Sequence, residues 1–132
     1  MKATKRTKAI WINRELIISP ASIGLCQTET QFKNELRKLK IPAADIPEWV
    51  AEGKDACVHC VEENNGNNKC FIVCIRADKK TEHSAILVLL VHEAVHVWRW
   101  IREDIGEKEP SSEFKAYAIQ NISQRLIEAY KR

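Results

Sequence analysis

His92-Glu93-Ala94-Val95-His96 lies within residues 85–101, a long apolar run that contains neither glycine nor proline. Such a run predicts a buried helix. Each helical residue advances about 100°, so the two histidines lie roughly 40° apart on neighbouring turns. Two imidazoles in that relation can bind one metal ion. The glutamate lies about 100° from the first histidine and can reach a water on that ion. The pattern therefore predicts a zinc site with a carboxylate base.

The pattern also has a plainer interpretation. A five-residue pattern in which three residues are fixed can occur by chance, and a histidine on a helix is often only a core residue. The surroundings favour a metal. Placing two histidines and Glu93 on one side of a buried helix costs several kcal/mol unless a partner satisfies them. The opposite side is a continuous apolar stripe of Leu87, Leu90, Ala94, Val97, Trp98 and Ile101.

The size and charge of the chain limit the classes of protein it can belong to. Its 132 residues suit one domain with one modest core. The net charge of +3 is too small to indicate nucleic-acid binding. No stretch reaches the ~20 apolar residues that a membrane span needs. Polar residues 13–15 interrupt any signal peptide, so we expect a cytoplasmic protein that binds no membrane. In that compartment we expect the five cysteines to carry no structural disulfide.

Residues that break strands and helices divide the N-terminal half of the chain. We expect a disordered basic tail over residues 1–8 and a single domain over residues 9–132. Residues 9–18 are rich in Ile and Trp and predict a strand, which Pro20 and Gly24 then end.

Two capping-box patterns follow, T-E-T-Q at residues 28–31 and D-I-P-E at residues 45–48. They predict a helix that ends at about Lys40 and a short helix that stops at Gly53.

Residues 56–76 predict a β-hairpin, because Asn65-Gly66 lies in a run of asparagines between two apolar segments. Cys60 and Phe71 would face the opposite side from the other cysteines. The register predicts that Cys57 lies opposite Cys74, His59 opposite Ile72, and Val61 opposite Cys70.

This hairpin also offers a rival metal site, through Cys57, His59, Cys60, Cys70 and Cys74. The predicted geometry is against it, since Cys60 faces away and the tight turn lies far from the cysteines. Buried cysteine is also a common small apolar residue in strands. We therefore predict core cysteines, and the sequence leaves a second metal open.

The C-terminal half predicts two helices, over about residues 81–104 and 111–130, with Gly106 stopping the first. The apolar stripe of the second comprises Ala116, Ile119, Ile122 and Leu126. The predicted class is α+β. A short antiparallel sheet, made of the hairpin and the N-terminal strand, packs on the buried HExxH helix and the C-terminal helix.

A catalytic zinc ion usually has three protein ligands, so a third must be found. Glu103 and Asp104 share the helix with the histidines and can hardly fold back onto the same ion. Glu107 and Glu109 lie in a loop. Glu113 begins the next helix and returns beside the histidines if the helices form an antiparallel pair. The alternative is that Glu113 faces solvent, although its neighbours Ala116 and Tyr117 favour partial burial.

The motif, followed after a short loop by Ser112-Glu113-Phe114-Lys115-Ala116-Tyr117, resembles a gluzincin-type zinc metallopeptidase. The flanking sequence is similar to small metallopeptidase-like proteins of phages and prophages, the minimal zincins. The resemblance covers residues 84–122. Larger members of the group have a longer sheet, whose edge strand holds the substrate.

The resemblance implies a zinc-dependent hydrolase that cleaves an amide bond of a peptide or protein. His92, His96 and Glu113 would hold Zn²⁺, and Glu93 would take a proton from the activated water. Tyr117 is the candidate oxyanion donor, although it is equally well explained as a packing residue. The alternatives are a non-catalytic, zinc-stabilised binding module and a prophage-type regulator with a zincin-like fold. The sequence does not indicate an oligomeric state.

Overall fold

The computed structural model describes residues 8–12, 21–62, 69–78 and 80–132. The predicted tail, apart from Lys8, and the Asn-Gly turn lie outside these residues. The strands are β1 (Ile10–Ile12), β2 (Ala21–Cys26), β3 (Ala56–Glu62) and β4 (Lys69–Ile75). The helices are α1 (Glu29–Lys38), α2 (His83–Asp104) and α3 (Ser112–Lys131), with a 3₁₀ turn at Ala43–Asp45.

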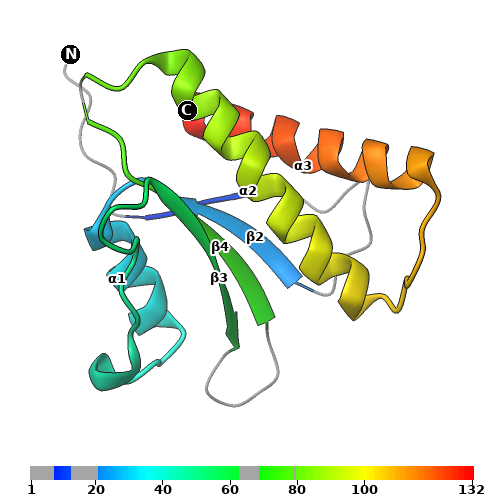
Figure 1. The fold of residues 1–132 in the computed structure, drawn as a ribbon. Helices are drawn as coiled ribbons and strands as arrows, with labels where there is room; N and C mark the ends of the chain where they lie inside the picture. The colour runs from blue at the N-terminus through cyan, green and yellow to red at the C-terminus, as the bar shows by residue number, and fades with distance from the viewer. Residues whose placement is uncertain (1–7, 13–20, 63–68, 79) are drawn as a thin grey trace.

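The described strands form one mixed sheet in the order β1-β2-β4-β3. β2 and β4 are parallel, while β1–β2 and β3–β4 are antiparallel. The α+β class is confirmed, but the prediction of an antiparallel sheet is wrong because a parallel pair lies at its centre. α2 and α3 cover one face of the sheet and α1 covers the other (Figure 1).

β2 is the strand that the sequence analysis missed, because Gly24 was taken as a break. In the structure Gly24 lies inside the strand, directly across from Trp11 of β1. A Cβ atom at Gly24 would lie 2.9 Å from two ring carbons of Trp11. The glycine therefore makes room for the indole of the neighbouring strand rather than ending its own.

The predicted hairpin register is confirmed in every pair, including Cys57 with Cys74 and His59 with Ile72. Cys60 lies across from Phe71, whose side chain enters the core beneath α2 and α3. β4 is buried along almost its whole length, as expected of a strand covered on both faces. β3 is the outer strand of the hairpin and forms one edge of the sheet.

The helix predicted to open at residue 28 is confirmed, with Thr28 as its N-cap. The Thr28 hydroxyl accepts a hydrogen bond from the backbone N–H of Gln31. The second predicted helix is wrong. Only the 3₁₀ turn Ala43–Asp45 forms before Pro47, because a proline favours extended backbone at the residue before it, here Ile46.

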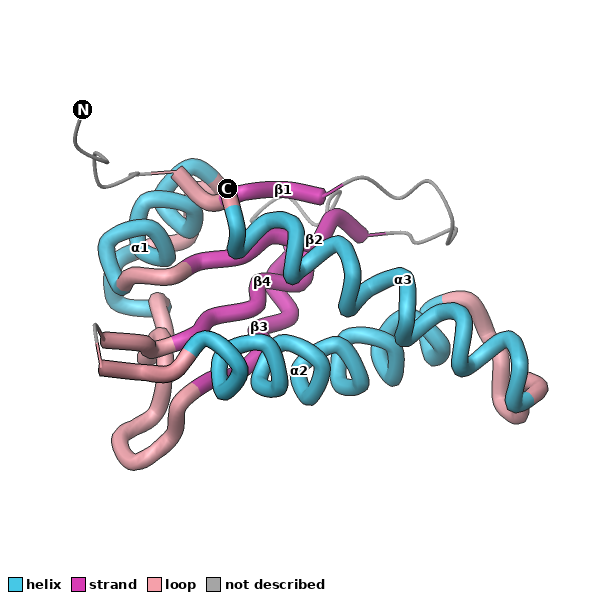
Figure 2. The backbone as a smooth tube through the Cα atoms, turned by 90° about the horizontal axis from the view of Figure 1, so that it is seen from above, coloured by secondary structure: helices cyan, strands magenta, loops and turns pink. Residues whose placement is uncertain are grey.

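α2 and α3 form an antiparallel pair. Trp98 contacts Phe114 near one end of the pair, with ring centroids 5.4 Å apart. The ring of His83 lies beside that of Tyr130 near the other end, with centroids 5.3 Å apart. α2 lies over β3 and β4, whereas α3 lies over β1 and β2 (Figure 2).

The burial of these two helices differs from the prediction in two respects. α2 is buried on one side only, since Val88, Val91 and Val95 are exposed. On α3 the exposed Ala116 does not belong to the inner stripe, and Ala118 takes its place beside Ile122 and Leu126.

The prediction that no segment could span a membrane also needs a correction. Within the described residues α2 is long and apolar enough to do so by length and composition alone. Core helices of soluble proteins pass the same test, and α2 packs on the sheet.

Candidate metal and catalytic site

His92 and His96 lie side by side on successive turns of α2. Their ring centroids are 5.1 Å apart and the rings meet edge to face. Both side chains are exposed, which differs from the buried histidines that the apolar run suggested. Two accessible imidazoles one turn apart have the placement that the HExxH pattern predicts for two nitrogen ligands.

Glu93 lies beneath this pair and is buried. One of its carboxylate oxygens, Oε2, lies 4.0 Å from Nε2 of His92. Burial raises the pKa of the Glu93 carboxyl above its ordinary value, and the nearby His92 and His96 offset part of that rise. A carboxyl with a raised pKa is better matched to accepting and then returning a proton near neutral pH.

A pocket of about 600 Å³ opens beside the three motif residues. One wall is the start of the edge strand β3, and another is the loop that carries Ala51 and Lys54. The α2 wall continues from the motif to Arg99, Trp100 and Glu103. A cavity of this size, with a few convergent polar groups, is typical of a small-molecule or peptide site.

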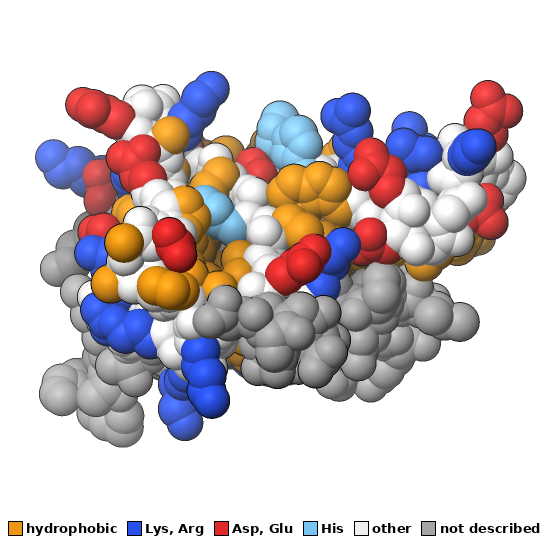
Figure 3. Space-filling view, turned by 90° about the horizontal axis from the view of Figure 1, so that it is seen from below, with side chains coloured by type: hydrophobic (Ala, Val, Ile, Leu, Met, Phe, Trp, Pro, Cys, Tyr) orange, Lys and Arg blue, Asp and Glu red, His pale blue; other side chains and the backbone are white. Residues whose placement is uncertain are grey.

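Histidine side chains reach the surface in two places on the face that Figure 3 shows. One group stands prominently beside a hydrophobic patch, and another lies recessed among hydrophobic side chains. Acidic and basic side chains surround both.

Glu113 and Tyr117 are not gathered with the histidine pair. Both are exposed on the first turns of α3, so the expected partial burial of Glu113 is wrong. Phe114, next to Glu113, contacts Trp98, and Trp98 lies roughly 140° around α2 from the histidines. Neither Glu113 nor Tyr117 lines the pocket. Their roles as third ligand and oxyanion donor stay predictions that this placement does not support.

The pocket contains two cationic side chains, Lys54 and Arg99, that the sequence analysis did not assign to the site. The position of Arg99 three residues after His96 was a usable signal, because residues that far apart share a helix face. Lys54 gave no such signal, since only the fold brings its loop to α2. The donor set fits a zinc ion in part: His92 and His96 supply two ligands, and no third is gathered among the described residues.

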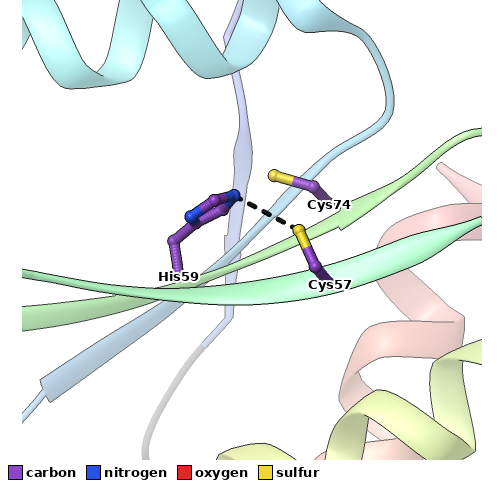
Figure 4. A group of neighbouring side chains, drawn as sticks. All are labelled: Cys57, His59 and Cys74. Atoms are coloured by element: carbon purple, nitrogen blue, oxygen red, sulfur yellow. Dashed lines mark hydrogen bonds between the residues drawn. The ribbon is translucent and has the colours of Figure 1, made fainter. Parts of the chain in front are cut away.

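A second group of metal-ligating residues lies on the other side of the sheet. Among the residues that the structure describes, Cys57, His59 and Cys74 are the one set of three whose ligand atoms all lie within 4.8 Å of one another. Figure 4 shows the three side chains on the same side of the sheet, with Cys57 and His59 on one strand and Cys74 on its neighbour. This group could hold a metal ion.

Hydrogen bonds connect this group to the loop before β3. The Cys57 Sγ atom lies 3.2 Å from Nε2 of His59 and 2.8 Å from the carbonyl oxygen of Trp49. The same His59 nitrogen lies 2.9 Å from that oxygen. Arg76 holds the loop in place by donating to the carbonyl oxygens of Val50 and Lys54.

These contacts shift the pKa values of the group. Hydrogen bonds from Cys74 and, less strongly, from His59 lower the pKa of Cys57 to about 5, against the opposing effect of burial. The pKa of His59 is raised: burial lowers it, but the contacts with Cys57 and the Trp49 carbonyl outweigh burial. The pKa of Cys74 is raised, because its thiol hydrogen bonds to Cys26 and Cys57 and is buried.

Comparison of the chain with protein-family models, with curated proteins and with solved structures finds no match. The candidate function therefore rests on the site residues and on the physical chemistry of their arrangement.

Proposed function

We propose that the protein is a metal-dependent hydrolase of the HExxH type, in which His92 and His96 bind Zn²⁺ and Glu93 is the catalytic base. One observation carries the proposal: two exposed imidazoles and a buried carboxylate converge on one pocket. When bound, the zinc ion would supply a Lewis acid that lowers the pKa of a water molecule from ~15.7 toward ~7.

Besides the two histidines, two polar residues of the pocket have a role in this proposal, Glu93 and Arg99. Glu93 takes the proton of the attacking water and passes it to the leaving amine. Arg99, one turn after His96, is placed to stabilise the negative charge that develops on the carbonyl oxygen. Glu113 remains the predicted third ligand, which requires the first turn of α3 to approach His96.

A peptide or protein in extended conformation is the substrate class that suits the pocket wall. β3 is an edge strand, and its first residues, Ala56–Val58, line the pocket beside the motif. An edge strand has free backbone N–H and C=O groups that can pair with another chain. A peptide added to β3 would run past His92 and Glu93.

We expect the hydrolase to act in the cytoplasm.

The test is cleavage of a proteome-derived peptide library by the zinc-loaded chain, with new termini identified by mass spectrometry. Glu93→Gln should lower the cleavage rate by roughly 10²- to 10⁴-fold, because it removes the base. Its zinc content should match that of the wild type.

Glu103→Gln is the matched control, since it neutralises another carboxylate of the same pocket. It should retain cleavage close to that of the wild type. Wild-type rates in Glu93→Gln would contradict the proposed role of Glu93.

The second candidate is a non-catalytic domain that uses a metal ion for stability. The observation in its favour is that Cys57, His59 and Cys74 are gathered, whereas the described part of the chain brings no third ligand to the histidine pair. Zinc bound at the cysteines alone, together with an absence of cleavage, would favour this candidate.

A further inference from the structure

The backbone alone brings three cysteines together. In the parallel pair β2–β4, Cys26 lies across from Cys74. In the antiparallel pair β3–β4, Cys57 also lies across from Cys74. Residues directly opposite one another on neighbouring strands share a face and lie about 4.5–5.5 Å apart. The three cysteines therefore form a row across three adjacent strands.

His59 lies on the same face as this row. It is two residues after Cys57 on β3, and alternate residues of a strand point to the same side. Its Nε2 atom is 3.2 Å from the Cys57 sulfur. Cys74, in the middle of the row, hydrogen bonds to both Cys26 and Cys57.

We propose that Cys26, Cys57, Cys74 and His59 form a second metal site, on the α1 face of the sheet, for a thiophilic divalent cation such as Zn²⁺. Three thiolates and one imidazole are a common donor set of structural zinc sites. Bond lengths of ~2.3 Å to sulfur and ~2.0 Å to nitrogen separate the ligand atoms of a tetrahedral site by about 3.5–3.8 Å. The ligand atoms of Cys57, His59 and Cys74 lie within 4.8 Å of one another, and Cys26 is connected to this group by the hydrogen bond between its thiol and that of Cys74.

The surroundings suit a closed, structural site. Cys26 and Cys74 are fully buried, whereas Cys57 and His59 are partly exposed and give an ion access from one side. The ring of Phe32 on α1 lies 4.6 Å from that of His59 and fixes its orientation. Around them is the apolar cluster between α1 and the sheet.

The Trp49 carbonyl oxygen lies 2.8 Å from Sγ of Cys57 and 2.9 Å from Nε2 of His59. A bound ion would take the place of these contacts at the two ligand atoms. The two proposed sites share no ligand, although Cys57 also lines the catalytic pocket. Substituting the ligands of each site in turn therefore distinguishes loss of metal at one from loss at the other.

The test is a Co²⁺ titration of the reduced full-length chain, because thiolate ligands give cobalt an intense near-ultraviolet charge-transfer band. The His92→Ala/His96→Ala variant should bind one cobalt ion per chain and show this band. Loss of a ligand's hydrogen-bond partner alone weakens metal binding by roughly 10- to 100-fold. Cys57→Ser removes a ligand itself and should therefore weaken cobalt binding by more than this.

Cys60→Ser is the matched control, because Cys60 is on the same strand but on the opposite face, and it should leave the band unchanged. Circular dichroism checks that each variant folds. Cys57→Ser, whose side chain is only partly buried, serves if the buried Cys74→Ser does not fold. No thiolate band in reduced protein, or a band that survives Cys57→Ser and Cys74→Ser unchanged, would overturn the proposal. So would a Cys57–Cys74 disulfide that forms while the reduced chain binds no cobalt.

Discussion

Oε2 of Glu93 lies 4.0 Å from Nε2 of His92, although the Glu93 side chain is 6% exposed and that of His92 is 66% exposed. The ligand position is thus open to solvent while the base beside it is not. This difference has consequences for stability as well as for catalysis.

The first prediction concerns pH. Burial raises the pKa of Glu93 in the folded chain above its unfolded value of ~4.3. The folded state therefore binds more protons than the unfolded state between those two values, and stability falls as pH rises through that window. Glu93→Gln removes this loss. In chelator-treated protein, urea unfolding should show Glu93→Gln gaining stability relative to the wild type between pH 4 and pH 8.

Glu103→Gln, which neutralises an exposed carboxylate of the same pocket, is the matched control. A Glu93→Gln variant that becomes relatively less stable as pH rises would contradict the assignment of a buried, destabilised carboxylate.

The second prediction concerns the reactivity of two thiols on one strand. The pKa of Cys57 is lowered to about 5 by its hydrogen bonds to Cys74 and His59, whereas burial raises the pKa of Cys60. The thiolate is the reactive form. The alkylation rate of Cys57 should level off above about pH 6, whereas that of Cys60 should still rise at pH 8. Site-resolved mass spectrometry of iodoacetamide labelling measures both; parallel profiles would contradict the prediction.

The third prediction concerns the β1–β2 pair. Gly24→Ala places a methyl group against the Trp11 ring and should lower the free energy of unfolding by about 1–3 kcal/mol. In a Trp11→Ala background the same substitution should cost less than half as much. A double-mutant cycle by urea denaturation measures the coupling. Equal costs in the two backgrounds would show that the ring does not occupy this space.

The fourth prediction concerns which residue stabilises the oxyanion, Arg99 of the pocket or Tyr117 of α3. Arg99→Ala should lower kcat by roughly 10²- to 10³-fold with unchanged zinc content, the effect of losing one oxyanion donor. Tyr117→Phe should leave kcat unchanged, because Tyr117 is 65% exposed and does not line the pocket. Loss of activity in Tyr117→Phe with activity retained in Arg99→Ala would restore the assignment made from sequence.

Local patterns predicted much of this fold. The Thr28 cap, the hairpin register and the extents of α2 and α3 follow from interactions between residues close in sequence, and all are present. β2 was missed because the reason for Gly24 lies on another strand, in the ring of Trp11. Without β2, the position of Cys26 beside Cys74 could not be predicted either.

The same limit applies to the candidate site. The spacing of His92, Glu93 and His96 placed them together because one helix carries all three. The positions of Glu113 and Tyr117 could be predicted only if the rotation of α3 about its own axis were known. That rotation depends on packing between helices, such as the contact of Phe114 with Trp98. The loop that carries Lys54 is held beside the pocket by a hydrogen bond from the Arg76 guanidinium to the Lys54 carbonyl oxygen. This contact joins residues 22 positions apart in the sequence.

The most direct test of the central claim, that His92 and His96 bind zinc, is a count of zinc ions per chain by native mass spectrometry. The account predicts two ions in the wild type, one in His92→Ala/His96→Ala and one in Cys57→Ser. A zinc count in the double histidine variant equal to that of the wild type would contradict it.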